Sequence, residues 1–319
     1  TVDAAGSTVR LDDGPPVVVV VGPTAAGKSD LGVALARALG GEVVNADSMQ
    51  LYQGMDIGTA KLPPAERRGV PHHVMDIWPV SEPASVAAYQ RLARAAIDDV
   101  LARGRVPLLV GGSGLYLRAV LEEFDFPGTD AALRAELEAQ LAVAGPGPLF
   151  ARLAELDPVA AGRILPSNGR RIVRALEVIT LTGETFTAQL PQQPTPAYRS
   201  VTLGVDMETA ALDERIAVRV DAMWRAGLVD EVRQLLGQGL RAGRTASRAL
   251  GYQQVIALLD GACAEETARQ DTVRATRRFV RRQRSWFRRD QRITWLAGVG
   301  DDLVTPALAA VQAAGTSVG

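Results

Sequence analysis

The segment from Gly22 to Ser29 contains residues that together could hold the phosphate groups of a ligand. It reads Gly-Pro-Thr-Ala-Ala-Gly-Lys-Ser, a complete G-x-x-x-x-G-K-[ST] loop. In such a loop backbone N–H groups and a helix N-terminus converge on an anion, the lysine neutralises the distal oxygens and the hydroxyl can ligate Mg²⁺. We therefore predict a diphosphate or triphosphate site with Ser29 as the metal ligand. Its residues are Gly22, Pro23, Thr24, Ala25, Ala26, Gly27, Lys28 and Ser29.

Lysine is rare in this chain. Lys28 and Lys61 are the only lysines among 35 basic residues, and both lie in Gly-containing segments. Because the chain uses arginine almost everywhere else, these positions are candidates for a compact, rotatable ammonium. We expect Lys61 to make a functional contact, with a structural capping role as the alternative.

The flanks of the phosphate loop have the required character. Val17–Val21 is a β-branched apolar run typical of a buried parallel strand. Leu31, Leu35 and Leu39 continue at helical spacing after Ser29. Strand, Gly loop and helix are the setting that this motif needs.

An acid follows the next predicted strand. Glu42–Asn45 is the strand, and Asp47 and Ser48 come just beyond its C-terminal end, where open parallel sheets place their ligands. In the usual Walker B pattern an apolar strand ends directly in an acid. Here the polar Asn45 interrupts the apolar run before Asp47. Asp47 could therefore be a metal-shell acid or a general base, and its position alone leaves both open.

Strands and helices alternate through most of the rest of the chain. Residues 85–103 have helical spacing, and residues 106–110 form an apolar strand that runs into the Gly-rich turn 111–114. Strand character returns at 201–205 and again at 292–296. This alternation predicts an α/β fold with a parallel sheet flanked by helices.

The pattern changes between about Pro127 and Pro196, where only helices are expected, bounded by Pro and Gly. We interpret this stretch as an inserted all-helical subdomain. The expected organisation is a disordered tail at 1–14, an α/β core with C-terminal helices at 15–126 and 197–300, the helical insertion at 127–196, and a C-terminal helix or tail at 301–319.

Composition limits the partners. The net charge of −1 excludes a uniformly basic surface, so a polyanion would have to meet a local basic patch. One cysteine, Cys263, and two histidines make a Cys-based zinc cluster or a histidine metal site improbable. The apolar runs are too short for a membrane span and the first 16 residues do not resemble a signal peptide. We expect a cytoplasmic protein with no membrane partner.

Arginine is most dense near the C-terminus. Nine arginines between Arg274 and Arg292 face a single acid, Asp290. Val273, Val280 and Phe287 recur on one helical face, which predicts one buried side and a basic remainder. Such a run can be a solvated face, but mutual repulsion favours a polyanion ligand.

Residues 47–61, joined to the phosphate loop, closely resemble tRNA dimethylallyltransferases, which prenylate adenine N6 in the anticodon loop of tRNA. Further matches run in family order over roughly residues 17 to 290. They are residues 71–76 (PHHVMD), 108–116 (LLVGGSGLY), 171–178 (RIVRALEV), 215–223, 251–252 and 282–288. The zinc-finger extension of eukaryotic relatives is missing, so the resemblance is to the bacterial type.

This resemblance implies a P-loop kinase-like fold that binds dimethylallyl diphosphate rather than ATP. Lys28, Thr24, Ser29 and Mg²⁺ would hold the diphosphate leaving group. Asp47 matches the family's general base, and Arg219 matches an arginine on the diphosphate side. Ser113 would hold N6 or a phosphate oxygen. The implied reaction moves the dimethylallyl group to N6 of the adenine 3′ to the anticodon.

The resemblance also implies that the anticodon stem-loop of tRNA is the partner and that the adenine leaves its stack. We expect a monomer. Arginines of the C-terminal helix would contact phosphates. For Arg174, pairing with Glu177 is an equal alternative. The residues assigned to tRNA are Asp47, Ser48, Met49, Gln50, Ser113, Arg134, Arg170, Arg171, Ile172, Val173, Arg174, Arg278, Arg281 and Arg284.

Two other classes of protein would use the same loop. A small-molecule kinase of the nucleoside or shikimate type would hold ATP there and use the helical insertion as a lid, but it would not need the arginine-rich helix. A nucleic-acid-stimulated ATPase is the second alternative, and the lack of a clear Walker B acid counts against it.

Overall fold

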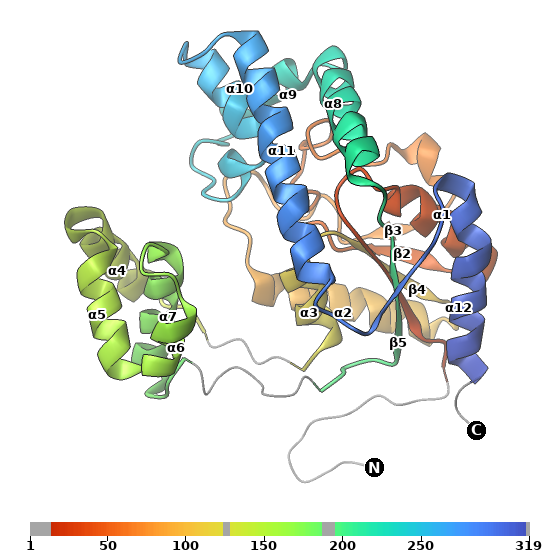
Figure 1. Ribbon diagram of the computed structural model, residues 1–319, viewed down its shortest axis with the longest axis horizontal. Coiled ribbons are helices and arrows are strands. Elements are labelled where there is room, and N and C mark those ends of the chain that lie inside the picture. Colours follow the sequence, from red (N-terminus) through yellow and green to blue (C-terminus); the bar gives the residue numbers. More distant parts are fainter. Residues whose placement is uncertain (1–13, 124–127, 187–194, 317–319) are drawn as a thin grey trace. The chain divides into compact units, whose positions relative to one another are not determined.

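A parallel six-stranded sheet organises the protein (Figure 1). The computed structural model describes residues 14–123, 128–186 and 195–316, so nearly all of the predicted tail lies outside the described residues. The strand order is β3-β2-β4-β1-β5-β6. The strands are β1 (Val17–Val21), β2 (Glu42–Asn45), β3 (His72–His73), β4 (Pro107–Gly111), β5 (Ser200–Gly204) and β6 (Ile293–Trp295). The predicted α/β class with a parallel sheet is confirmed, and β3 is a strand that the sequence pattern does not reveal.

The valine run of β1 is buried because both faces of the sheet are covered. Alternate side chains of a strand point to opposite faces. Val18 and Val20 pack in one apolar cluster with α1 (Lys28–Leu39), and Val17, Val19 and Val21 pack in another with α2 (Val86–Ala102) and α3 (Gly114–Leu121). This two-sided core explains why the strand is a continuous apolar run and not an alternating one.

The C-terminal segment belongs to the core. From the sequence, residues 301–319 are expected to form a separate helix or tail. In the structure η3 (Gly300–Leu303) leads into α12 (Val304–Thr316), and Leu303, Ala307 and Val311 are buried in the same cluster as α1. The segment therefore completes one face of the sheet.

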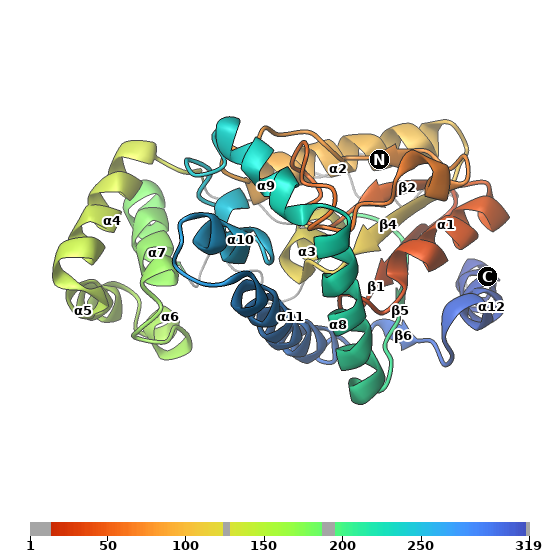
Figure 2. The same cartoon turned by 90° about the horizontal axis from the view of Figure 1, so that it is seen from above.

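Four helices lie beyond the strand ends and complete the main unit. They are α8 (Thr209–Arg225), α9 (Leu228–Gly237), α10 (Tyr252–Leu259) and α11 (Glu265–Phe287), with the short helices η1 (Pro64–Arg67) and η2 (Ala246–Arg248) in nearby loops. Figures 1 and 2 both show α8 beside α11, and Ile216 and Val220 of α8 pack against Val280 of α11. The predicted burial of Val280 and Phe287 is confirmed, whereas Trp286 next to them is 45% exposed.

The described residues of 123–195 form a second compact unit, and the remaining described residues form the first. The second unit holds α4 (Ala131–Ala144), α5 (Pro146–Leu156), α6 (Pro158–Arg163) and α7 (Gly169–Thr182). Ile172 and Val173 of α7 are 0% and 3% exposed and lie in its core with Leu137 and Leu153. The expectation that Ile172 and Val173 contact tRNA is therefore wrong for their side chains, which hold the helices of this unit together.

No helix in the described part of the chain has both the length and the apolar character that crossing a bilayer requires.

Candidate active site

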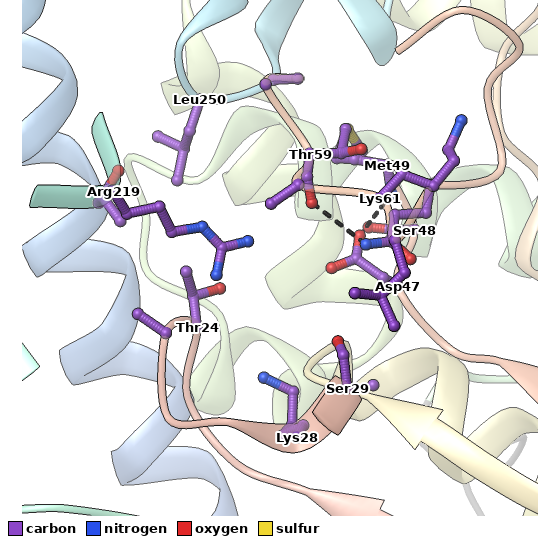
Figure 3. Close-up of a pocket in the computed structure, with 18 of the residues that line it drawn as sticks. Thr24, Lys28, Ser29, Asp47, Ser48, Met49, Thr59, Lys61, Arg219 and Leu250 are labelled. Carbon is purple, nitrogen blue, oxygen red and sulfur yellow. Dashed lines mark hydrogen bonds between the residues drawn. The ribbon is translucent and has the colours of Figure 1, made fainter. Parts of the chain in front are cut away.

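The loops that follow β1, β2 and β4 open into one cavity of about 770 Å³ (Figure 3). Because these strands are parallel, their C-terminal ends meet at the same edge of the sheet. The cavity is lined by most of the predicted site residues of the first unit: Thr24, Ala25, Gly27, Lys28, Ser29, Asp47, Ser48, Met49, Gln50, Ser113 and Arg219. The phosphate loop and the acid therefore share one cavity.

Three residues of the predicted loop shape it instead of lining the cavity. A Cβ at Gly22 would lie 2.1 Å from the carbonyl oxygen of Val205, so only glycine allows this approach. The Pro23 carbonyl accepts a hydrogen bond from the Lys28 Nζ at 2.8 Å, and also one from the amide of Ala26 at 3.3 Å. These contacts curl the loop back on itself at the start of α1.

Lys28 lies in an environment prepared for an anion. Burial lowers the pKa of its ammonium to about 8, although the nearby Asp47 carboxylate acts to raise the pKa and Arg219 acts to lower it further. These couplings place an acid and a second cation close to Lys28. A bound anion would supply the negative charge that the buried ammonium lacks.

Arg219 reaches the same space from α8. Figure 3 shows its guanidinium pointing into the cavity above Thr24. Burial is the main cause that lowers the pKa of this guanidinium, and its Nε is buried without a hydrogen-bond partner. Buried donors are costly to leave unpaired, so Arg219 is prepared to bind an acceptor such as a phosphate oxygen.

Asp47 is held by the polar residue that interrupts the Walker B pattern. Asn45 is 4% exposed; its Oδ1 accepts a hydrogen bond from the Asp47 amide at 2.9 Å, and its Nδ2 donates to the Asp47 carbonyl at 3.1 Å. The Asp47 Oδ1 accepts from the Met49 amide at 2.9 Å. Its Oδ2 has no hydrogen-bond partner among the residues that the structure describes, which leaves one oxygen open toward a ligand.

Ser113 connects the turn after β4 to the loop after β2. Its Oγ accepts a hydrogen bond from the Ser48 amide at 3.2 Å and donates one to the Ser48 Oγ at 3.3 Å. The Ser113 hydroxyl is thus hydrogen-bonded to Ser48, the residue that follows Asp47 in the chain. It can orient a group that approaches the open carboxylate oxygen.

Two arginines assigned to tRNA neutralise a buried acid. Glu177 is 0% exposed, and its Oε2 accepts hydrogen bonds from Arg134 at 2.5 Å and from Arg174 at 2.7 Å. The pairing alternative for Arg174 is therefore confirmed, and Arg134 has the same role. Arg170 and Arg171, by contrast, are exposed on α7.

The arginines of α11 differ from one another. Arg278 and Arg281 are exposed. Arg284 has a side chain only 11% exposed, and its Nε donates to Asp206 at 2.8 Å while its Nη1 donates to Thr209 at 2.8 Å. These contacts use the Arg284 charge to fix α11 to the loop after β5, which argues against the assignment of Arg284 to tRNA.

Lys61 also has a structural role. Its side chain is 4% exposed, and its Nζ forms ion pairs with Asp56 (2.6 Å) and Asp76 and a hydrogen bond to the Tyr52 carbonyl at 3.0 Å. These contacts support the structural capping alternative. Lys61 also lines the cavity, so the functional contact stays a prediction. The residue is needed as a lysine because one compact ammonium meets three acceptors.

The sequence patterns do not show which groups two important residues bind. The Gln283 side chain of α11 forms hydrogen bonds to both the phosphate loop and the turn after β4. Glu231 of α9 accepts hydrogen bonds from the amides of Ile57 at 2.8 Å and Asp56 at 3.1 Å, and from the Tyr252 hydroxyl at 2.5 Å, which fixes the loop before Lys61. Gln283 lies within the family match 282–288, but that match does not indicate which groups its side chain binds.

The comparisons with known proteins agree on one family. A family model described as IPP transferase matches residues 50–290. A tRNA dimethylallyltransferase of Salinispora arenicola is 73% identical over 93% of this chain and 87% of that relative, and one of Streptomyces coelicolor is 66% identical over 92% and 95%. Among solved structures, the tRNA isopentenylpyrophosphate transferase of Bacillus halodurans has a TM-score of 0.68 and 39% identity, covering 94% of this chain and 97% of that one. A eukaryotic dimethylallyltransferase captured acting on tRNA has a TM-score of 0.78 and 28% identity, covering 89% and 74%.

The sheet with its phosphate loop and the cavity at its edge define an α/β P-loop transferase. The chain belongs to the IPP transferase family, whose members include tRNA dimethylallyltransferases. This membership favours a prenyltransferase over a kinase of the nucleoside or shikimate type.

Proposed function

We propose that this protein transfers a dimethylallyl group from dimethylallyl diphosphate to N6 of the adenine 3′ to the anticodon of tRNA and releases diphosphate. The observation that carries the proposal is the shared cavity, in which Lys28 and Arg219 lie close to the carboxylate of Asp47. The two cations can stabilise the departing diphosphate, and the carboxylate beside them can accept the proton that the nucleophile loses.

The cations act on the leaving group. Lys28, Arg219 and the loop amides at the start of α1 stabilise negative charge as the carbon–oxygen bond to the diphosphate breaks. The Ser29 hydroxyl lines the same cavity and would hold Mg²⁺, which takes one or two protein oxygens along with substrate phosphates and water. When bound, the ion would neutralise further charge on the diphosphate.

Asp47 acts on the nucleophile. Adenine N6 is a weak nucleophile because its lone pair is delocalised into the ring. The open Oδ2 of Asp47 accepts the N6 proton as nitrogen bonds to the allylic carbon, while Ser113 and Ser48 orient the amine. The adenine reaches the cavity by leaving its stack, as base-modifying enzymes require.

The tRNA contacts in this proposal come from the loop Asp47–Gln50, from Arg278 and Arg281 on α11, and from Arg170 and Arg171 on α7. Exposed arginines provide phosphate contacts that position the RNA without reading its sequence. We expect activity as a monomer and in the cytoplasm.

The experiment combines radiolabelled dimethylallyl diphosphate with unmodified tRNA, with ATP hydrolysis measured in parallel. Label should enter the RNA at the adenine 3′ to the anticodon, with no nucleotide turnover. A tRNA with guanine in place of that adenine is the matched control and should stay unlabelled. ATP hydrolysis without labelled RNA would contradict the proposal and favour the kinase or the ATPase.

A further inference from the structure

Gln283 faces the interior from a helix that is otherwise basic. It lies between Arg282 and Arg284 on α11 and is 6% exposed. Its Oε1 accepts a hydrogen bond from the backbone amide of Thr24 at 2.9 Å, and its Nε2 donates one to the carbonyl of Gly112 at 2.9 Å. Both ends of the amide are therefore used, one as acceptor and one as donor.

The two bonds join the two halves of the cavity. Thr24 belongs to the phosphate loop, whereas Gly112 directly precedes Ser113, whose hydroxyl contacts the loop next to Asp47. The phosphate loop follows β1 and the turn with Gly112 follows β4. Gln283 is thus one side chain that fixes the distance between the anion cradle and the groups that orient the nucleophile.

The glycines of the turn make this bridge possible. A Cβ at Gly112 would lie 2.4 Å from the Gln283 Nε2, and a Cβ at Gly114 would lie 2.1 Å from the Trp286 Nε1. Gln283 and Trp286 are three residues apart and so lie on the same face of α11. A side chain at either position would have to displace these two α11 side chains from the turn.

We propose that Gln283 is a positioning residue for the transfer reaction, which holds the phosphate loop and the Ser113 turn in register through its two hydrogen bonds. The inference rests on the proposed function. It also assigns a use to the Thr24 amide: this N–H is already bonded to Gln283, so Thr24 offers its hydroxyl to the cavity. Small errors in the placement of reacting groups cost large factors in rate.

The test compares three variants under single-turnover conditions, at a temperature where circular dichroism shows each to be folded. Gln283→Met has a similar size and removes both hydrogen bonds. Gln283→Glu keeps an acceptor for the Thr24 amide but places a second acceptor against the Gly112 carbonyl. Gln270→Met is the matched control, because Gln270 is an exposed glutamine on the same helix.

We expect Gln283→Met to lower the transfer rate at saturating substrates about 30-fold or more, with KM for tRNA within about threefold of the parent. Gln283→Glu should lower it at least as much, because it places a buried carboxylate against the Gly112 carbonyl and beside the anion cradle, and Gln270→Met should behave as the parent. Transfer by Gln283→Met at the parental rate, or a loss confined to tRNA affinity, would overturn the inference. If Gln283→Met does not fold, Gln283→Glu decides by the same criteria. A parent enzyme that transfers no label would instead reject the proposed function.

Discussion

The Lys28 ammonium donates a hydrogen bond to the carbonyl oxygen of Pro23 at 2.8 Å, within its own loop. In the free enzyme this cation is therefore held by a neutral backbone group, and burial lowers its pKa to about 8. Until an anion binds, the hydrogen-bond acceptor of the Lys28 ammonium is a neutral carbonyl and not a negatively charged group. Binding and stability should both depend on this arrangement.

The first prediction concerns the pH dependence of diphosphate binding. Above pH 8 the free enzyme loses the Lys28 proton, so kcat/KM for dimethylallyl diphosphate should fall, by roughly fivefold between pH 8 and pH 9 and by about tenfold per pH unit above that. The measurement is kcat/KM from pH 6.5 to 9.5 at saturating tRNA. A profile that stays flat through pH 9 would show that Lys28 does not need its charge.

The second prediction concerns stability. The pKa of Lys28 in the folded protein is about 8, below the ordinary lysine value of 10.5. The unfolded chain therefore binds more protons between these values, and the Lys28 contribution to the free energy of unfolding rises with pH across that window. Below pH 8 the buried ammonium costs on the order of 3 kcal/mol.

Lys28→Met should accordingly abolish transfer but raise Tm at pH 7 by a few degrees. Lys61→Met is the matched control, because it removes the other lysine and leaves Asp56 and Asp76 without their shared cation. It should lower Tm. Differential scanning calorimetry of both variants and the parent checks the pair, and a lower Tm for Lys28→Met at pH 7 would contradict the prediction.

The third prediction concerns the general base. Asp47→Asn keeps an acceptor for the Met49 amide and removes the charge that takes up the N6 proton. Single-turnover transfer should fall by a factor of about 10² to 10⁴, while dimethylallyl diphosphate still binds. Asp30→Asn is the control, since Asp30 lies at the same cavity on α1 and should change the rate less than about threefold. Near-parental transfer by Asp47→Asn would remove Asp47 from the base role.

The sequence predicts the cavity well because its parts are local. The phosphate loop, the acid after β2 and the turn with Ser113 each follow a strand, and the parallel sheet brings such ends together. Pairings across the fold have no such local signal. The sequence places Glu231 and Gln283 on helices, but only the structure shows the distant backbone groups that they bind.

The tRNA assignments that burial and ion pairs argue against have a common physical cause. Ile172 and Val173 stand inside a motif with arginines, yet the turn of α7 directs them into the core. Arg284 is surrounded by exposed arginines, yet it meets Asp206 on a loop 78 residues earlier in the chain. A motif gives the residue types in order, whereas the face on which each side chain lies depends on what the helix packs against.

The last prediction separates the arginines of α11. Arg278 and Arg281 are exposed and form no ion pair within the described residues, so their charges are available to RNA phosphates. Each phosphate contact that is lost should reduce the slope of log affinity against log salt concentration by about 0.7 to 0.9. Arg278→Gln and Arg281→Gln should therefore weaken binding of an anticodon stem-loop RNA several-fold, regardless of its sequence.

Arg284→Gln is the matched control on the same helix. Its guanidinium is bonded to Asp206 and Thr209, so this change should lower Tm and leave the salt slope unchanged. Fluorescence anisotropy with a labelled stem-loop between 50 and 300 mM KCl measures all three variants. If Arg284→Gln reduces the slope as much as Arg281→Gln does, the ion pair with Asp206 must open on RNA binding, and the division of this helix into a structural and an RNA-binding face would be wrong.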